Sequence, residues 1–303
     1  MTDTQNEEFK TPVNKIRLFE HGAPGSQNLK LTRKYYTEDM PDGRVKHIVQ
    51  NITDPDIVPY IPDGIGNSTD RQRIPAVLII PGGAFRRLVY NFEGEDVAKW
   101  LNSMGIAAFV LECRLPSDEH DNAEDVPLID AMRAMRVIRG RAQEFGIDEA
   151  KIGVMGFSAG GFMAALLSTA YESDVYADYK YKDEYDKLSA RPDFAVCSYP
   201  VISIDDCIEA GKRYMSEEQV LERISDSKAK ILHKYNPDKL VRPDMPPVFI
   251  CETDDDRTTL SENSVGFYMA ARKAGVSAEL HIFRTGGHGS VSYTHLRAHE
   301  TCA

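Results

Sequence analysis

Residues 151–171 read KIGVMGFSAGGFMAALLSTAY, and this stretch decides the fold. The apolar run 151–155 is too short for a helix and is typical of a buried strand, whereas a helical stretch opens at residue 158. Between them, Gly156-Phe157-Ser158-Ala159-Gly160 matches G-x-S-x-G in the strand–turn–helix setting that this pattern needs. So tight a turn leaves no room for side chains at its glycines and pushes the serine hydroxyl outward. We predict that Ser158 is a nucleophile, with an ordinary strand–helix turn as the alternative.

The chain on both sides of this stretch alternates between strand and helix signals. Short apolar runs suit strands buried on both faces, as in a parallel sheet covered by crossover helices. We expect strands at 76–80, 106–112, 152–156, 194–199, 248–252 and 279–283, and helices at 93–104, 127–145, 158–171 and 261–274. The repeated strand–helix–strand order predicts an α/β fold with a doubly wound, mostly parallel sheet flanked by helices.

The length of the chain fits one large α/β domain. Residues 1–70 are polar, with weak extended patterns broken by proline and glycine, and we expect an N-terminal arm leading into edge strands of the same domain. Residues 71–289 would form the main, catalytic part. Within it, residues 202–240 are long, charged and helix-prone, which predicts a cap inserted above the carboxyl edge of the sheet.

The 303 residues include 36 basic and 47 acidic side chains, for a formal net charge of −11. This sign argues against nucleic acid or an anionic membrane as a partner. No window approaches the roughly 18 consecutive apolar residues of a spanning helix, and the start MTDTQNEEFK lacks the apolar centre of a secretory signal. The five cysteines show no metal-type spacing. We expect a protein of the reducing cytoplasm. The sequence does not indicate whether the chain is a monomer or an oligomer.

A serine hydroxyl is a poor nucleophile at neutral pH and needs a base within hydrogen-bond reach. His288 stands in Gly286-Gly287-His288-Gly289, a glycine-rich loop directly after the last expected strand, where an imidazole can project freely. It follows both the serine and the candidate acids, which is the Ser…acid…His order of α/β hydrolases. We predict that His288 is the base, although a single histidine is more often structural.

The acid that orients this histidine is expected in the loop after the strand 248–252. That loop reads Thr253-Asp254-Asp255-Asp256-Arg257. A carboxylate there would fix the imidazole tautomer and stabilise the imidazolium formed during acyl transfer. Three adjacent aspartates leave the choice open: Asp256 is our prediction, and Asp254 is its main competitor. We expect no metal at these aspartates, since no histidine or alternating oxygen ligands accompany them.

Acyl transfer also needs donors for the oxyanion of the tetrahedral intermediate. Pro81-Gly82-Gly83-Ala84-Phe85 follows the strand 76–80, where esterases of this fold carry a His-Gly-Gly-Gly type loop. We predict that the amides of Gly83, Ala84 and Ala159 converge on the oxyanion; a plain glycine turn is the alternative. Phe85 and Tyr90 come next and would line the substrate pocket, or equally belong to the core.

Over residues 16–289 the chain resembles the acetylxylan esterase-like family of carbohydrate-ester esterases, which have the α/β-hydrolase fold. The motifs that carry the resemblance are Pro81-Gly82-Gly83, Glu93-Gly94, Pro127-Leu128-Ile129-Asp130-Ala131 with Arg133 and Arg136, residues 153–161, Arg191-Pro192-Asp193-Phe194, Asp255-Asp256-Arg257-Thr258, Glu262-Asn263-Ser264, Ala274-Gly275-Val276, residues 279–283 and Gly287-His288-Gly289. In that family the acid precedes the position matched by Arg257, so the resemblance implies Asp256. It also implies acetyl or other short acyl groups on plant-polysaccharide fragments.

Two positions in the loops depart from the family pattern. Ala84 stands where a third glycine is usual, and because its amide is retained we expect the oxyanion loop to work. Thr259-Leu260 replaces the usual Val-Pro, which we expect to alter the shape of the acid loop.

The last fourteen residues depart most. Residues 290–303 read SVSYTHLRAHETCA, which resembles a cloning read-through rather than the final helix of the family. His295 and His299 lack the glutamate of a zinc-protease H-E-x-x-H motif, so no metal site is expected there. Without the final helix we expect an uncovered apolar sheet face and weaker support for His288.

The resulting prediction is a serine carboxylic-ester hydrolase that acts on short-chain acyl esters, needs no cofactor, and takes a small ester or an acylated oligosaccharide as substrate. One alternative is a peptidase of the same fold, because one set of three side chains can serve both esters and amides. Another is a catalytically silent scaffold that binds a small ligand, since fold alone does not settle function.

Overall fold

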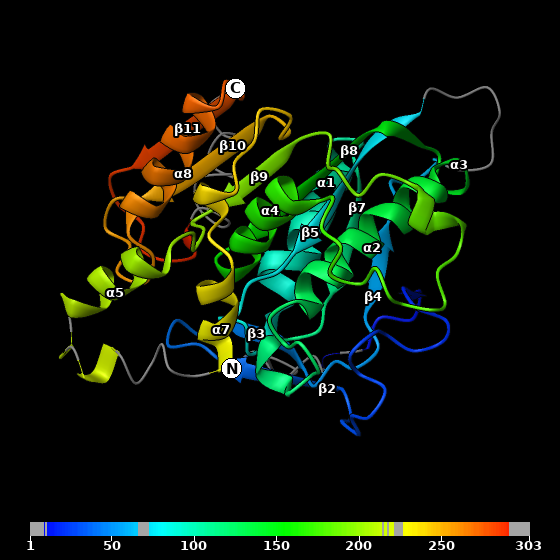
Figure 1. Ribbon diagram of the computed structural model, residues 1–303, viewed down its shortest axis with the longest axis horizontal. Coiled ribbons are helices and arrows are strands. Elements are labelled where there is room, and N and C mark those ends of the chain that lie inside the picture. Colours follow the sequence, from blue (N-terminus) through cyan, green and yellow to red (C-terminus); the bar gives the residue numbers. More distant parts are fainter. Residues whose placement is uncertain are drawn as a thin grey trace, which may run out of the picture.

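The short apolar runs of the sequence form one eight-stranded sheet in the computed structural model, which describes residues 9, 11–65, 73–213, 215–216, 218–220 and 227–290 (Figure 1). The strands in spatial order are β1 (Ile16–Arg17), β4 (Asp56–Tyr60), β7 (Ala107–Glu112), β5 (Ile74–Ile80), β8 (Ile147–Phe157), β9 (Ala195–Ser198), β10 (Val248–Thr253) and β11 (Ala278–Phe283). The pairs β1–β4 and β4–β7 are antiparallel, and all other neighbours are parallel. The prediction of a mostly parallel α/β sheet is confirmed.

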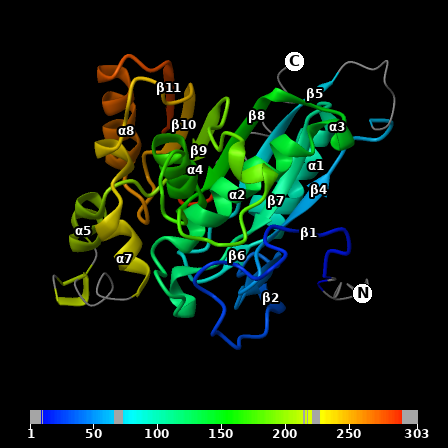
Figure 2. The same ribbon diagram turned by 45° about the vertical axis from the view of Figure 1, so that its right-hand side comes forward.

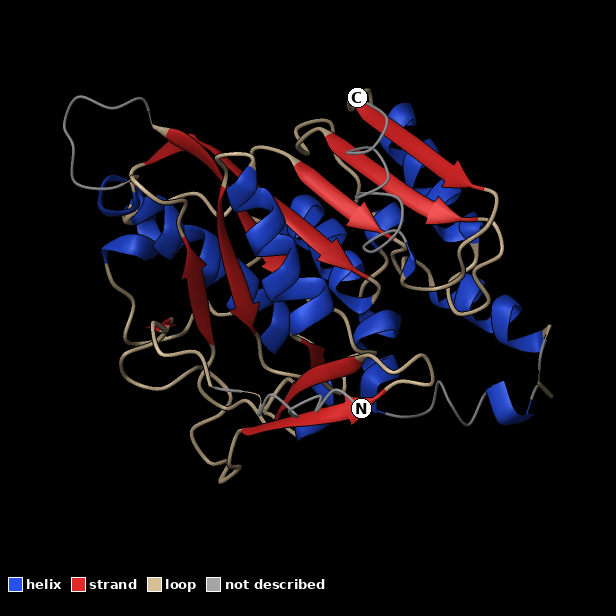
Figure 3. Cartoon of the chain, turned by 180° about the vertical axis from the view of Figure 1, so that it is seen from behind, coloured by secondary structure: helices blue, strands red, loops and turns tan. Residues whose placement is uncertain are grey.

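Helices cover both faces of this sheet. Helices α2 and α4 pack against each other on the face turned to the viewer in Figure 1, whereas α1 lies on the opposite face, seen from behind in Figure 3. The helices are α1 (Asp96–Ser103), α2 (Val126–Gly140), α3 (Ala142–Phe145), α4 (Ala159–Ala170), α5 (Ile204–Lys212), α7 (Ser227–Lys234) and α8 (Ser261–Lys273), with a π-helical turn η1 (Asn91–Glu95) and 3₁₀ turns η2 (Pro116–Asp118), η3 (Glu184–Lys187) and η4 (Pro237–Lys239). Helix α4 is buried from its first residue through Thr169, which explains why it is apolar on every side.

The N-terminal region contributes to two sheets. Strands β1 and β4 form the antiparallel edge of the main sheet, whereas β2 (Lys34–Asp39) and β3 (Val45–Gln50) pair with β6 (Leu88–Val89) in a separate three-stranded sheet. Of the extended stretches expected in the N-terminal arm, β2 and β3 therefore do not enter the main sheet. The small sheet lies below it in Figure 2, next to the loop that follows β5.

The segment expected as a cap, residues 202–240, contains α5 and α7; its positions 214, 217 and 221–226 lie outside the described residues. At the end of α7, Lys234 Nζ and the Tyr235 hydroxyl donate to the Asp125 carboxylate, at 2.7 and 2.5 Å. Asp125 immediately precedes α2, which follows the carboxyl end of β7. The described part of the segment thus contains two helices, and α7 is attached to the residue that precedes α2; the role of the segment as a cap stays a prediction.

A buried ion pair fixes the chain directly after β7. Arg114 and Asp130 are both 0% exposed, and the Arg114 Nη2–Asp130 Oδ1 distance is 2.6 Å. Arg114 also donates to the carbonyl of Pro24 and, at 2.8 Å, to the hydroxyl of Ser26. The pair joins the N-terminal arm to helix α2, and its removal on one side would leave an uncompensated buried charge.

Three cysteines that the sequence places beside apolar runs, Cys113, Cys197 and Cys251, are buried thiols without a disulfide partner. None of the helices in the described part of the chain combines the length and the apolar character needed to cross a bilayer. Residues 1–8, the 66–72 stretch that includes the expected domain boundary, and the whole tail 291–303 with His295 and His299 lie outside the described residues.

Candidate active site

Ser158 occupies a strained turn between β8 and α4. Its backbone has φ 54° and ψ −117°, a region that residues other than glycine rarely adopt. Gly160 makes the close approach possible, since a Cβ there would lie 2.0 Å from the carbonyl oxygen of Ile80. The turn therefore brings the Ser158 side chain to the carboxyl edge of the sheet at the amino end of α4, as the G-x-S-x-G pattern predicts.

His288 reaches this serine from the loop after β11. Its Nε2 lies 2.9 Å from the Ser158 hydroxyl oxygen, and its Nδ1 lies 2.7 Å from Asp256 Oδ2. The imidazole is 27% exposed and meets the Tyr199 ring edge-on, at 5.0 Å between ring centroids. Three side chains from three loops thus form one continuous chain of hydrogen bonds.

Asp256 is the carboxylate at the buried end of this chain. Its side chain is 0% exposed, and besides His288 it accepts hydrogen bonds from the amides of Thr258 and Thr259, at 2.7 and 3.0 Å. Burial works to raise its pKa, but the hydrogen bond and charge of His288 together with these amides outweigh burial and lower the pKa of Asp256. The carboxylate therefore stays ionised and can hold an imidazolium.

The other two aspartates of the loop lie at the surface. Asp254 is exposed and contacts the Ser261 hydroxyl at 3.5 Å, away from the imidazole. Asp255 accepts from the amides of Gly286 and Gly287, at 3.1 and 2.8 Å, and so supports the loop that carries the histidine. These amides lower the pKa of Asp255. Of the competing acids, Asp256 is the one that the fold brings to His288.

Thr259 is one of the two departures from the family pattern in the loops, and its hydroxyl takes part in the site. It donates to Asp256 Oδ2 at 2.9 Å and lies 3.4 Å from His288 Nδ1. The residue that the sequence marks as a disturbance of the acid loop therefore adds a hydrogen bond to the carboxylate.

The loop after β5 faces the nucleophile turn. Gly83, Ala84 and Phe85 all have positive φ, at 138°, 57° and 59°. No acceptor among the described residues is hydrogen-bonded to the amides of Gly83, Ala84 or Ala159. The three amides that the sequence predicts as oxyanion donors thus make no hydrogen bond in the described part of the chain, whereas the amide of the preceding glycine, Gly82, binds a side chain.

Glu93, in the π-helical turn η1, occupies the amide of Gly82. Its Oε2 accepts from Gly82 N at 2.7 Å, and its Oε1 accepts from the hydroxyl of Tyr199 at 2.9 Å. The sequence predicts no role for Glu93 or Tyr199. Glu93 and Gly82 are 11 residues apart in sequence, and no local pattern indicates their contact, which only the fold creates.

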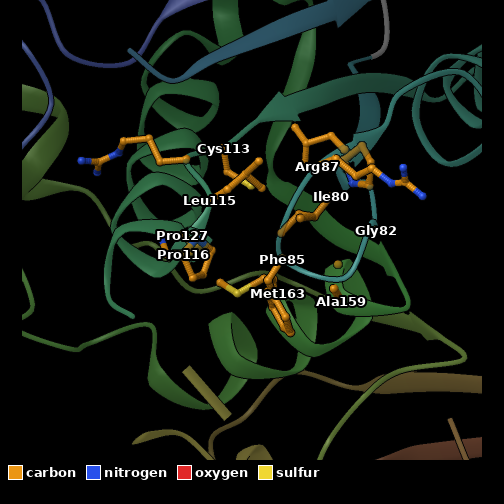
Figure 4. Close-up of a pocket in the computed structure, with 14 residues that line it drawn as sticks. Ile80, Gly82, Phe85, Arg87, Cys113, Leu115, Pro116, Pro127, Ala159 and Met163 are labelled. Carbon is orange, nitrogen blue, oxygen red and sulfur yellow. The ribbon is translucent and has the colours of Figure 1, made fainter. Parts of the chain in front are cut away.

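The two aromatic residues expected to line the substrate pocket, Phe85 and Tyr90, have different surroundings. Phe85 packs edge-on against the Phe162 ring, at 5.5 Å, and lines a small apolar cavity of about 10 Å³ together with Met163 and Ala159 (Figure 4). Tyr90 is 1% exposed, and its hydroxyl lies 3.2 Å from that of Tyr60. Phe85 therefore lies beside the site, and Tyr90 fits the alternative of a core residue.

A second carboxyl group lies beneath Asp256. Glu252, at the end of β10, is 0% exposed, and its Oε1 accepts from the amide of Thr253 at 2.9 Å. Burial raises the pKa of Glu252 to about 9; the Thr253 amide opposes this shift and the charge of Asp256 adds to it. At neutral pH this carboxyl group is protonated, so Asp256 carries the negative charge next to the histidine.

Two known proteins are similar to this chain over about three quarters of its length. The chain is 30% identical over 227 residues to an acetylxylan esterase of Xylanibacter ruminicola, a match that covers 74% of this chain and 43% of that protein. It is 31% identical over 221 residues to an endo-1,4-beta-xylanase B of Butyrivibrio fibrisolvens, covering 73% of this chain and 33% of that protein. The chain thus spans less than half the length of these two relatives.

Solved structures agree with the fold. An acetyl ester-xyloside bifunctional hydrolase from Caldicellulosiruptor lactoaceticus is 37% identical, with a TM-score of 0.64 over 82% of this chain and 85% of that one. An esterase of Thermogutta terrifontis with bound propionate is 22% identical, with a TM-score of 0.62 over 92% of both chains, and shows the fold alone. The predicted α/β-hydrolase fold is confirmed.

The model of one protein family, BD-FAE, matches residues 65–270, which is well over half of the chain. The match includes residues 81–85, Ser158 and Asp256 and ends before His288. The expectation of an esterase family related to acetylxylan esterases is confirmed at the level of the family. The chain belongs to the BD-FAE family.

Proposed function

We propose that this chain is a serine carboxylesterase that hydrolyses short-chain acyl esters of xylan-type saccharides, with Ser158, His288 and Asp256 as its catalytic residues. The observation that carries the proposal is the hydrogen-bond chain from the Ser158 hydroxyl through both nitrogens of His288 to the buried Asp256. We expect the amides of Gly83, Ala84 and Ala159, which make no hydrogen bond in the described part of the chain, to receive the negative oxygen.

The reaction begins at the serine. His288 Nε2 accepts the proton of the Ser158 hydroxyl, at 2.9 Å, while the serine oxygen forms a bond to the acyl carbon of the ester. The carbonyl π bond opens, and its electron pair moves onto the oxygen. Asp256 stabilises the imidazolium that forms, because it is ionised and binds Nδ1 at 2.7 Å.

The negative oxygen of the tetrahedral intermediate is held by the amides of Gly83, Ala84 and Ala159. Two features support this assignment: the three amides have no acceptor among the described residues, and Ala159 begins α4, whose amino end favours an anion. Collapse of the intermediate breaks the bond to the alcohol. The alcohol takes the proton from His288 and departs, and the acyl group stays bound to Ser158. Water, deprotonated by His288, then attacks the acyl carbon. The bond from this carbon to the Ser158 oxygen breaks, and His288 returns the proton to the serine as the acid leaves.

The substrate class is proposed from the relatives. Proteins similar to this chain are named acetylxylan esterase, xylanase B and acetyl ester-xyloside hydrolase. All three names refer to xylan or to xylosides, and two of them refer to acetyl esters. We therefore expect acetylated xylan fragments to be better substrates than long-chain esters.

Hydrolysis of p-nitrophenyl esters from acetyl to octanoyl tests the reaction class. We expect turnover to be fastest for acetyl and propionyl and to fall with chain length. Ser158→Ala removes the attacking oxygen and is expected to lower kcat by roughly 10³-fold or more. A variant as active as the parent, or a folded parent without turnover, would contradict the proposal, whereas strong cleavage of aminoacyl amides with little of acetyl esters would indicate a peptidase.

The choice of acid is tested by a matched pair, Asp256→Asn and Asp254→Asn. The first removes the charge beside His288 and disturbs its tautomer, so we expect kcat to fall by about 10³- to 10⁴-fold. The second alters an exposed carboxylate and is expected to leave kcat within about twofold of the parent. Equal losses in both variants would show that Asp256 has no special part in the reaction.

The protonated Glu252 predicts a pH dependence of stability. The folded protein keeps this proton up to about pH 9, whereas the unfolded chain releases it near its ordinary pKa. Between these limits the unfolded state binds fewer protons than the folded state, so this group lowers the free energy of unfolding as pH rises. Glu252→Gln removes the effect.

We therefore expect the difference in free energy of unfolding between Glu252→Gln and the parent to move in favour of the variant from pH 5 to pH 8. Urea denaturation at each pH measures it. A difference that stays constant with pH would mean that Glu252 is ionised in the folded protein.

A further inference from the structure

Glu93 connects two walls of the site through one carboxyl group. One oxygen accepts the hydrogen of Gly82 N, at the start of the oxyanion loop, and the other accepts the hydroxyl hydrogen of Tyr199, directly after β9. Gly82 and Tyr199 are 117 residues apart in sequence, so no local interaction accounts for the link. Both oxygens of one side chain are thus used at the site.

Each end of this link lies against a residue of the proposed reaction. A Cβ at Gly82 would lie 2.4 Å from the Phe157 carbonyl oxygen and 3.0 Å from the Ser158 Cβ, so the loop passes very close to the nucleophile. At the other end, the Tyr199 ring meets the imidazole of His288 edge-on. Tyr199 itself has a φ of 37°, a conformation that needs support from its surroundings.

The local backbone presents Glu93 in this direction. It belongs to η1, a π-helical turn at the amino end of α1, and such turns occur often at functional sites. Gly94, next to it, lies so close to Val110 of β7 that a Cβ at this position would be 2.9 Å from Val110 Cγ1. The turn is thus pressed onto the sheet beneath the oxyanion loop.

We propose that Glu93 is a positioning residue for ester hydrolysis, which holds the oxyanion loop at a fixed distance from the wall formed by Tyr199 and His288. This inference rests on the proposed esterase reaction. By binding the amide of Gly82, Glu93 orients the peptide units that follow, whose amides at Gly83 and Ala84 receive the oxyanion. Its effect is on the transition state, since those amides bind strongly only when the oxygen becomes negative.

The carboxyl group can do this without charge. Burial raises the pKa of Glu93, although the hydrogen bonds from Tyr199 and Gly82 and the charge of His288 oppose the shift. A glutamine can make the same two contacts, because its carbonyl oxygen accepts from Gly82 N and its amide donates to the Tyr199 oxygen. Alanine can make neither.

The test compares Glu93→Ala, Glu93→Gln and, as a matched control from the same turn, Glu95→Ala. The Glu95 side chain is ion-paired with the exposed Lys99, and its amide hydrogen bond to the Tyr90 carbonyl is kept by alanine. With p-nitrophenyl acetate we expect Glu93→Ala to lower kcat by about 10- to 100-fold and to change KM by less than about threefold. Glu93→Gln and Glu95→Ala should stay within about threefold of the parent.

A second readout does not need activity. Hydrogen exchange of the peptide covering residues 81–90 should become faster in Glu93→Ala and stay as in the parent in Glu93→Gln. Unchanged exchange and unchanged kcat in Glu93→Ala would overturn the inference. So would a loss in Glu93→Gln as large as in Glu93→Ala, which would assign the effect to charge. If the parent hydrolyses no ester, the proposed function fails, and the exchange experiment still decides whether Glu93 holds the loop.

Discussion

The site depends on the parallel arrangement of strands β5, β8, β10 and β11. Parallel strands end at the same edge, so the loops that follow them meet there although they are far apart in sequence. Each loop brings one component of the proposed site: residues 81–85 after β5, Ser158 after β8, Asp256 after β10 and His288 after β11. A change in strand order would separate these groups even if each loop kept its local shape.

The rigidity of that edge has an energetic basis. The positive φ of Ser158 costs on the order of 1–3 kcal/mol, which the surrounding structure must offset. Helix α4, which starts at the strained residue, is buried along nearly its whole length and packs on both α2 and the sheet. Burial of this apolar helix, at about 25 cal/mol per Å² of apolar surface, helps to offset that cost. The packing of β8 and α4 on either side of the turn supports its strained backbone.

Much of this arrangement could be predicted from the sequence. The buried strands and amphipathic helices follow from local periodicity, and Ser158 and His288 stand in glycine-rich loops with a recognisable pattern. The residues alone left Asp254 and Asp256 as alternatives, because neighbouring carboxylates differ only in which one the fold turns inward. Only Asp256 is buried; Asp254 is exposed.

Other features were beyond the sequence because they are contacts between distant segments. The pairing of β3 with β2 and β6, the Thr259 hydroxyl on Asp256 and the link from Glu93 to Gly82 and Tyr199 belong to this class. None of them has a local pattern, since a half-exposed strand or a single polar side chain can find many partners. The cytoplasmic location and the role of residues 202–240 as a cap stay predictions.

The proposed reaction requires that the hydroxyl oxygen of Ser158 becomes acylated, and a covalent label tests this most directly. The chain is incubated with a p-nitrophenyl phosphonate ester, whose adduct does not hydrolyse, until ester hydrolysis has stopped, and its peptides are analysed by mass spectrometry. The account predicts one phosphonyl group per chain, on the peptide that contains Ser158 and on that residue. Loss of activity with an unmodified Ser158, or a label on a different residue alone, would contradict it.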